Sequence, residues 1–426
     1  MASFQVRYSL ASYKSHRTKG ELNRFCTKSK HSTMYPVFPF DIFSLIIDIA
    51  GENEDTSLLK ELVLVSHSFH QICIKYLFAN VELHDVDLDY FTSSKKGFIK
   101  LVKGRPNVVN CIRKITYKVS HNNNSDLLLS PMLSNFFPTT SRLNSLAINA
   151  SNFRWNELDS SLTSAFLHLM SLPTMNHIDL SNIQNFPLSS LTSSVNLLRL
   201  DILRLTCRKH FDHEEDNFIK TVQSEMMPKI REFHTSGSCL LTKKLLPVFN
   251  FMDLRHLSVS LSHFKHEPNI RYLLQNAKLL ERLHLSVGNG VSFMGLLSTS
   301  ARTLKVLDLT VYLYQSYHNP PLAGLCEELE AIAGHNMLEA LSFEVLVYDF
   351  RVYTQDFVRS AIQKVEDVLV KPGWSTLRQV SFKIPVIDLG GSTFTEALQS
   401  LPDKYFSHLS KLESIAFNYS AYPVNN

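Results

Sequence analysis

Apolar residues dominate residues 39–50, in a pattern that predicts a short helix. Pro39 suits the first turn of a helix, because a proline lacks only an N–H group that would have no helical partner there. Asp41 lies where a carboxylate meets the positive end of the helix dipole. Gly51 predicts that the helix ends near Ala50.

Two further short helices are predicted before residue 78. One of residues 55–57 can cap the second helix, in which Leu58, Leu62 and Val65 recur along one face. The motif Ser68-x-x-Gln71 matches a capping box and predicts the start of a third helix. Three helices therefore fit into about 45 residues.

The first of these helices carries more apolar side chains than two short neighbours can cover. Its apolar side chains are Ile42, Phe43, Leu45, Ile46, Ile47 and Ile49. We expect either the rest of the chain or another protein to cover the excess.

Beyond residue 77 the chain repeats a strand-like signature of three apolar positions, Φ-x-x-Φ-x-Φ, at intervals of roughly 30 residues. The twelve matches are Phe78/Val81/Leu83, Ile112/Ile115/Tyr117, Leu143/Leu146/Ile148, Met175/Ile178/Leu180, Leu200/Leu203/Leu205, Ile230/Phe233/Thr235, Leu254/Leu257/Val259, Leu280/Leu283/Leu285, Leu304/Leu307/Leu309, Leu338/Leu341/Phe343, Leu377/Val380/Phe382 and Leu412/Ile415/Phe417. One match is weak evidence in an apolar chain, whereas twelve in succession indicate a repeat architecture.

The intervals between these matches have helical patterning, as in residues 214–226, 268–279, 322–333 and 356–370. Alternating strands and helices predict an α/β fold in which a parallel sheet lines one side, helices cover the other, and leucines fill the space between. We therefore expect a three-helix unit at residues 37–83, followed by an irregular solenoid over residues 84–426.

Composition and charge narrow the class of protein. The chain has 426 residues, of which 44% are hydrophobic and 19% charged, so it can bury a continuous core. The net charge is +4, and residues 1–35 hold seven basic residues against one acid, so the remainder is close to neutral. This balance predicts a disordered basic tail at residues 1–35 and gives no basic field for nucleic acid.

Cysteine usage and hydropathy bear on location. The six cysteines have no regular spacing, which favours a reducing compartment, the cytoplasm or the nucleus. No stretch reaches the length of a membrane span, and residues 1–35 lack the apolar region of a secretory signal. Their basic and serine-rich composition leaves a mitochondrial transit peptide as a third, less favoured interpretation.

The helical unit resembles an F-box, and the whole chain resembles the F-box proteins with leucine-rich repeats, of the divergent kind abundant in fungi. The resemblance rests on Phe38-Pro39-Phe40-Asp41-Ile42-Phe43, on Leu45-Ile46-Ile47, and on Val65-Ser66-His67-Ser68-Phe69. Phe38 stands where the family has leucine, and Phe69 where it has tryptophan. The repeats lack the asparagine that follows the strand in regular leucine-rich repeats.

The resemblance implies a substrate-recognition subunit of an SCF-type cullin-RING ubiquitin ligase. Such a subunit binds a Skp-family adaptor, and through it the cullin and RING subunits, while its second domain holds a protein target. We expect the adaptor to contact Phe38, Pro39, Ile42, Phe43, Ile46, Leu62, Val65 and Phe69. Several of these side chains could instead fill the core of the helical unit.

Residues between the leucines of each strand should face away from the helices, because side chains alternate along a strand. The candidates for contacts with a target are His256, Ser258, Ser260, Arg282, His284, Ser286, Asp308, Thr310, Gln379, Ser381 and Lys383. Their mixed charge identifies no ligand, and an ordinary solvated sheet face is the simpler interpretation of each residue.

Catalytic and metal-binding interpretations find little support. Residues 210–216, His67 with His70, and residues 85–89 contain metal-ligand types without a complete ligand set. Phosphate-loop and nucleophile-elbow motifs are absent from the sequence. We therefore expect a non-enzymatic protein without a cofactor. The alternative to a ligase subunit is a leucine-rich-repeat scaffold whose helical unit only caps the solenoid.

Overall fold

The computed structural model describes residues 40–53, 55–84, 92–119, 133, 137, 142–207, 227–236, 249–261, 267–288, 292–313, 324–347, 363–386, 398–399 and 406–424. The chain forms two compact units, Met1–Ile112 and Arg113–Asn426. The predictions made for residues 1–35, 85–89 and 210–226 lie outside the described residues, as do Phe38 and Pro39. No helix in these ranges is both long enough and apolar enough to cross a membrane.

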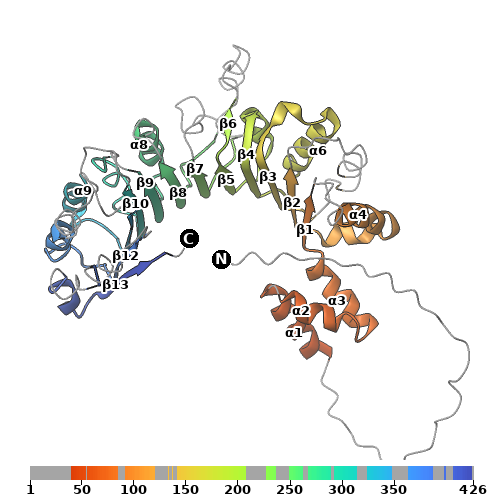
Figure 1. The fold of residues 1–426 in the computed structure, drawn as a ribbon, viewed down its shortest axis with the longest axis horizontal. Helices are drawn as coiled ribbons and strands as arrows, with labels where there is room; N and C mark the ends of the chain where they lie inside the picture. Colours follow the sequence, from red (N-terminus) through yellow and green to blue (C-terminus); the bar gives the residue numbers. More distant parts are fainter. Residues whose placement is uncertain are drawn as a thin grey trace, which may run out of the picture. The chain divides into compact units, whose positions relative to one another are not determined.

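Three packed helices open the first unit: α1 (Phe40–Glu52), α2 (Thr56–Leu62) and α3 (His67–Leu77) (Figure 1). Asp55 caps α2, since its carboxylate accepts a hydrogen bond from the Leu58 N–H group at 3.1 Å. The prediction that Ser68 begins the third helix was wrong by two residues, because the hydroxyl of Ser66 caps α3 by accepting from the Phe69 N–H group at 3.2 Å. The first helix also continues past Gly51 to Glu52.

The core of this helical bundle is small. Ile47, Ala50, Leu59 and Cys73 are buried together, and parts of neighbouring side chains pack around them. On the rim of this core the carboxylate of Asp48 ties α1 to α3, since it accepts hydrogen bonds from Lys75 at 2.9 Å and from Tyr76 at 2.8 Å. These bonds lower the pKa of Asp48, with Lys75 as the larger cause. The first unit also contains β1 (Asn80–His84), α4 (Thr92–Gly104) and the 3-10 helix η1 (Pro106–Cys111).

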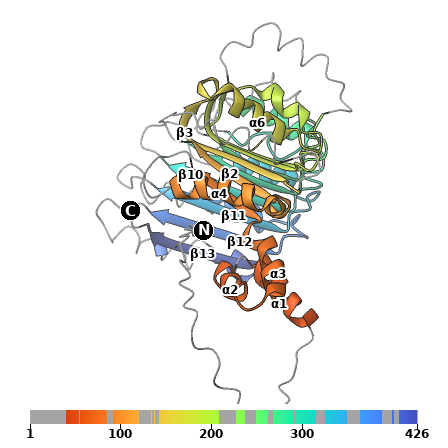
Figure 2. The same cartoon turned by 90° about the vertical axis from the view of Figure 1, so that its right-hand side faces the viewer.

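A long parallel sheet forms the second unit. Its strands lie in the order β2-β3-β4-β5-β7-β8-β9-β10-β11-β12-β13, and the short β6 pairs with β4. The bounds are β2 (Lys114–Val119), β3 (Ser145–Arg154), β4 (His177–Phe186), β5 (Arg199–Leu203), β6 (Thr206–Cys207), β7 (Glu232–Ser236), β8 (His256–Leu261), β9 (Arg282–Val287), β10 (Val306–Leu313), β11 (Ala340–Val347), β12 (Gln379–Val386) and β13 (Ala416–Pro423). Every pairing within this unit for which the described residues give a register is parallel (Figure 2).

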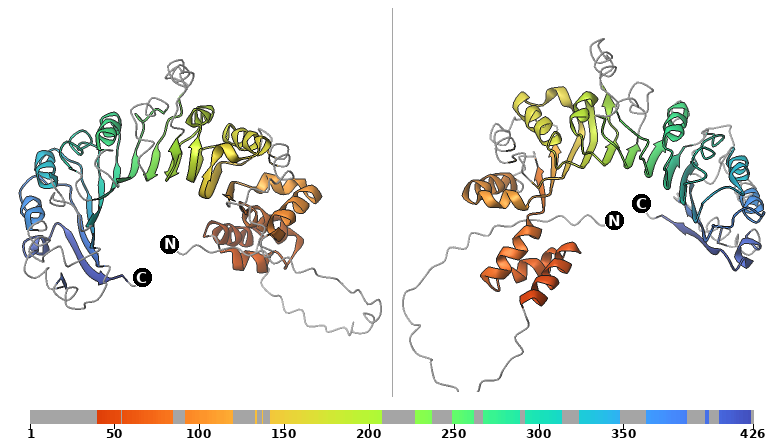
Figure 3. Two further views of the ribbon diagram at one scale, coloured as in Figure 1. Left: turned by 45° about the horizontal axis from the view of Figure 1, so that its top comes forward. Right: turned by 180° about the vertical axis from the view of Figure 1, so that it is seen from behind.

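Helices cover one face of this sheet, as Figure 3 shows from two sides. They are η2 (Trp155–Glu157), α6 (Ser160–Met170), η3 (Leu188–Ser193), α8 (Glu267–Asn276), α9 (Leu325–Ile332) and η7 (Leu409–Lys411), and residues 363–369 are helical as well. The structure therefore confirms the predicted α/β class, with N-terminal helices followed by a repeating parallel sheet. The helices found at 267–276 and 325–332 match those predicted at 268–279 and 322–333.

The register of the sheet stacks equivalent apolar positions into a continuous core. Leu257, Leu283 and Leu307 are partners across β8, β9 and β10, and all three are at most 1% exposed. Each strand adds one layer to this core and leaves the residues in between on the opposite face. The constant spacing of the apolar positions within each strand signature is the direct cause of this stacking.

Two of the twelve predicted repeats were misplaced, one in phase and one in register. In β5 the residues that face the core are Leu200 and Ile202, whereas Leu203, predicted as a core position, is 44% exposed. The signature here is Leu197/Leu200/Ile202, because the apolar run in residues 197–205 fits two phases equally well. In the last repeat Phe417 and Tyr419 pair with Val380 and Phe382, so the prediction was two residues early.

Two buried glutamates connect neighbouring repeats on the helical side. Glu328 in α9 is 5% exposed and accepts hydrogen bonds from the N–H groups of Gly295 and Leu297. Glu366 is 1% exposed and accepts from the N–H groups of His408 at 3.0 Å and Leu409 at 3.1 Å. In each case one carboxylate satisfies two backbone donors of a turn that belongs to another repeat.

Candidate protein-interaction surfaces

Helix α1 carries two apolar stripes on adjacent faces. Phe43, Ile47 and Ala50 lie at helical spacing on the face toward α2 and α3, where Ile47 and Ala50 are buried. The ring of Phe43 lies 5.3 Å from the ring of Phe69, which joins the start of α1 to the start of α3. This buried stripe is therefore the part of α1 that packs against α2 and α3.

The second stripe of α1 is exposed. It consists of Ile42, Leu45, Ile46 and Ile49, whose spacing of three, four and seven residues places them on one face of the helix. Their exposed fractions are 40%, 59%, 45% and 50%. In the turn between α2 and α3, Leu64 is 84% exposed and Val65 is 65% exposed. We call Ile42, Leu45, Ile46 and Ile49 the α1 stripe.

Of the eight residues predicted to contact an adaptor, the six that the structure describes divide into two groups. Ile42, Ile46 and Val65 are exposed. Phe43, Leu62 and Phe69 are half-buried, and Leu62 and Phe69 pack against the core of the bundle. Leu45, Ile49 and Leu64 were not predicted as contact residues, although the spacing of Leu45 and Ile49 from Ile42 was a signal that could have identified them.

The face of the sheet that the helices leave uncovered is called the open face below. A network of polar side chains crosses this open face from β3 to β8. At its centre the Asp201 carboxylate pairs with His177 at 2.9 Å, with Arg199 at 3.1 Å and with His234 at 3.9 Å. At its end Glu232 pairs with Arg199 at 3.5 Å and with His256 at 3.4 Å. Equivalent positions on adjacent parallel strands lie opposite each other, so the network follows from the register.

The pKa values in this network reflect burial and neighbouring charge. Burial raises the pKa of Asp179, which faces Asp201 across β4 and β5 and accepts a hydrogen bond from Ser181. Burial opposes ionisation of Asp201 too, but the hydrogen bond with His177 and the charge of Arg199 lower its pKa. Burial lowers the pKa of His234.

Ser145, His177 and Asp201 form a hydrogen-bonded chain of the residue types that act in serine hydrolases. The Ser145 hydroxyl lies 3.0 Å from Nδ1 of His177, and Nε2 of His177 lies 2.9 Å from Asp201. Ser145, however, is only 7% exposed, and Asp201 is shared with Arg199 and His234. We therefore assign these three hydrogen-bonded side chains a structural role in joining β3, β4 and β5. The network was not predicted, because the phase expected for β5 made Leu203 a core residue, and Arg199 and Asp201 lie on the same face of the strand as Leu203.

The residues predicted to contact a target share the open face of the sheet. His256 pairs with Arg282 across β8 and β9, and Ser258, His284 and Asp308 are partners across β8, β9 and β10. Gln379 and Lys383 lie on β12, separated from these residues by β11, and both are exposed. Whether these residues contact a target remains a prediction.

Three further candidates on that face are buried, contrary to the expectation that they are accessible. Ser286, Thr310 and Ser381 are 5%, 6% and 8% exposed. A short side chain on a sheet face is covered by longer neighbours, as at Thr310, whose hydroxyl lies 3.3 Å from the Glu344 carboxylate.

Within the ranges that the structure describes, no three side chains of His, Cys, Asp or Glu are grouped closely enough to hold a metal ion. His67 and His70 share a face of α3, with ring centroids 6.4 Å apart and nearly parallel planes. Nothing in this arrangement adds a third ligand.

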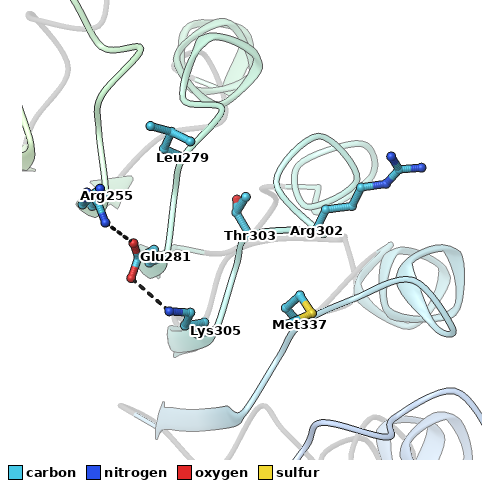
Figure 4. Close-up of a pocket in the computed structure, with 7 residues that line it drawn as sticks. All are labelled: Arg255, Leu279, Glu281, Arg302, Thr303, Lys305 and Met337. Atoms are coloured by element: carbon cyan, nitrogen blue, oxygen red, sulfur yellow. Dashed lines mark hydrogen bonds and ion pairs between the residues drawn. The ribbon is translucent and has the colours of Figure 1, made fainter.

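The edge of the sheet where the strands begin is hollowed in two places. One hollow of about 440 Å³ is lined by Val195, Asn196, Leu197, Leu198, Met227, Lys229, Arg231 and Asp253. A second hollow of about 220 Å³ is lined by Arg255, Leu279, Glu281, Arg302, Thr303, Lys305 and Met337 (Figure 4). In the second hollow Glu281 pairs with both Arg255 and Lys305, while Arg302 points away from these ion pairs.

Comparisons with known proteins give no further assignment: no protein-family model matches the chain, and a search of curated proteins found no match.

Proposed function

We propose that this chain is the substrate-recognition subunit of an SCF-type ubiquitin ligase. The first unit would bind a Skp-family adaptor, which links it to the cullin and RING subunits, and the second unit would hold a protein target. The chain itself would carry out no chemistry, because ubiquitin transfer belongs to the other subunits of such a ligase.

The observation that carries this proposal is the α1 stripe. Four exposed aliphatic side chains on one face of a helix do not stabilise a monomer in water. Such a contiguous apolar surface is typical of a site that another protein covers. The helical spacing of the stripe matches the way in which one helix presents anchors to a groove on a partner. The resemblance of residues 37–83 to an F-box supplies the identity of that partner.

The α1 stripe can supply part of the free energy of binding to a partner. Burying an aliphatic side chain of this size completely contributes about 1.5–3 kcal/mol, and roughly half of each side chain in the stripe is exposed. Covering all four would contribute roughly 3–6 kcal/mol before the entropic cost of association. The stripe can therefore serve as the central anchor of an interface.

Co-purification with a Skp-family adaptor tests the proposal. The test variant is Ile42→Asp with Ile46→Asp, because both side chains are exposed and their replacement leaves the core formed by Ile47 intact. A matched control is Leu203→Asp, which alters an equally exposed aliphatic side chain in the second unit. We expect the wild type and the control to recover the adaptor and the double variant to lose it. Equal recovery with all three proteins would contradict the proposal.

A further inference from the structure

At the edge of the sheet where the strands begin, the residues that precede β5 and β7 to β11 form a continuous surface. We call this surface the ledge. The residue immediately before a strand donates a backbone hydrogen bond from its N–H group to the carbonyl oxygen of the equivalent residue in the preceding repeat. Arg231 donates to Leu198 at 2.8 Å, and Arg255 donates to Arg231 at 2.9 Å. The same bonds continue from Glu281 to Arg255, from Lys305 to Glu281 and from Glu339 to Lys305. Because every strand is parallel, both hollows lie along this one ledge.

Exposed apolar side chains gather on the ledge. Among the described residues of the second unit, ten large hydrophobic side chains are exposed, and five of them lie in the turns that lead into β5, β8, β9 and β11. These five are Val195, Leu198, Met252, Leu279 and Met337, with exposed fractions between 38% and 57%. Methionine adapts its shape to different partners, and it recurs on protein-binding surfaces for that reason.

The charge beside these apolar side chains is mainly positive. Five basic residues line the two hollows, and only two acids, Asp253 and Glu281, accompany them. Glu281 already pairs with Arg255 and Lys305. The other three basic residues, Lys229, Arg231 and Arg302, form no ion pair within the described part of the chain. Asp253 and Glu339, which also lie on the ledge, form no ion pair within the described part of the chain either, so the ledge combines apolar surface with a small excess of positive charge.

We propose that this ledge, rather than the open face of the sheet, is the surface that holds the target, and that it binds an acidic peptide segment with apolar anchor side chains. This inference rests on the proposed function and specifies the chemistry of its target. Apolar anchors would enter the two hollows, and carboxylates on the same segment would pair with Lys229, Arg231 and Arg302.

The dimensions of the ledge suit a helical segment. Neighbouring strands lie about 4.8 Å apart, so Leu279 before β9 and Met337 before β11 are separated by about 10 Å, close to the rise between helical positions i and i+7. The path from Leu198 to Met337 covers five strand spacings, or about 24 Å, the length of a helix of roughly 16 residues. Helical segments that dock through anchors at such spacings are a common mode of peptide recognition.

A displayed library of random 16-residue peptides, selected against the full chain, tests the proposal. The selected peptides are synthesised, and their affinities are measured by fluorescence polarisation for the wild type and two variants. The ledge variant is Leu279→Glu with Met337→Glu, which places negative charge in the second hollow. The control is Leu203→Glu, on the open face of the sheet, where the side chain is 44% exposed.

We expect selected peptides that are net acidic and carry apolar residues at helical spacing. Their affinity should fall about tenfold or more with the ledge variant and change less than about twofold with Leu203→Glu. Selection of neutral or basic peptides, failure to select any, or a larger loss with Leu203→Glu would overturn the inference. Adaptor binding is measured on the same variants and should be unchanged, so a failure of this inference is distinguishable from a failure of the proposed ligase function.

Discussion

Truncation should destabilise the bundle much more on the buried face of α1 than on its exposed face. Ile47 is 1% exposed and packs in the core with Leu59 and Cys73, so Ile47→Ala removes buried methyl groups and leaves a cavity. Such changes cost about 2–5 kcal/mol. Ile49 is 50% exposed, so Ile49→Ala loses at most about half of a side-chain transfer energy, roughly 1 kcal/mol. The better helix propensity of alanine offsets a few tenths of a kcal/mol of that loss.

Hydrogen exchange measured by mass spectrometry over residues 67–77 can compare these variants in the full chain. The amide groups of α3 should exchange about 30-fold faster or more in Ile47→Ala, because 2 kcal/mol corresponds to that change in the opening equilibrium. In Ile49→Ala the rates should change by less than about fivefold. Equal effects of the two variants would mean that the α1 stripe is packed in solution, and the reasoning for an adaptor surface would then fail.

Three further predictions concern the bundle and the sheet. Asp48→Asn should destabilise the helical bundle by less than about 1 kcal/mol at pH 7, because the pair with Lys75 is partly exposed. Since the folded pKa of Asp48 is lowered, its contribution is lost as the pH falls through that pKa, so the α3 exchange protection of wild type and variant, corrected for intrinsic rates, should converge as the solution is acidified. Glu366→Ala should lower the free energy of unfolding by about 2–5 kcal/mol, because the buried N–H group of Leu409 and the partly buried N–H group of His408 lose their acceptor. Glu366→Gln should cost less, and thermal unfolding followed by circular dichroism measures both variants. Ile202→Ala should cost about 2–5 kcal/mol and Leu203→Ala less than about 1 kcal/mol in the same assay, and the reverse order would restore the phase that the sequence suggested for β5.

The fold was predictable because its cause is a simple repetition. Leucine positions such as Leu257, Leu283 and Leu307 recur at similar intervals, and a parallel sheet is the arrangement that stacks them. The phase of β5 was not predictable, since both Leu197/Leu200/Ile202 and Leu200/Leu203/Leu205 satisfy the same pattern. Only pairing with β4, which places Leu200 beside Ile178, decides between them.

The interaction surfaces were predictable only in part. Excess apolar surface on α1 followed from composition, but its division into a buried stripe and an exposed stripe depends on where α2 and α3 pack. The ledge could not be identified from single positions, because Leu198, Leu279 and Met337 lie in turns of different repeats, far apart in the sequence. Parallel pairing brings these turns to one edge, and that information is absent from any local pattern.

Direct titration of the purified chain with a purified Skp-family adaptor tests the central claim most directly. Isothermal calorimetry would compare the wild type with the Leu45→Asp, Ile49→Asp double variant, whose side chains are the most exposed in the α1 stripe. We predict saturable binding by the wild type and at least a tenfold weaker Kd for the variant, since about 1.4 kcal/mol suffices for that change. Undetectable binding by the wild type, or an unchanged Kd in the variant, would contradict the account.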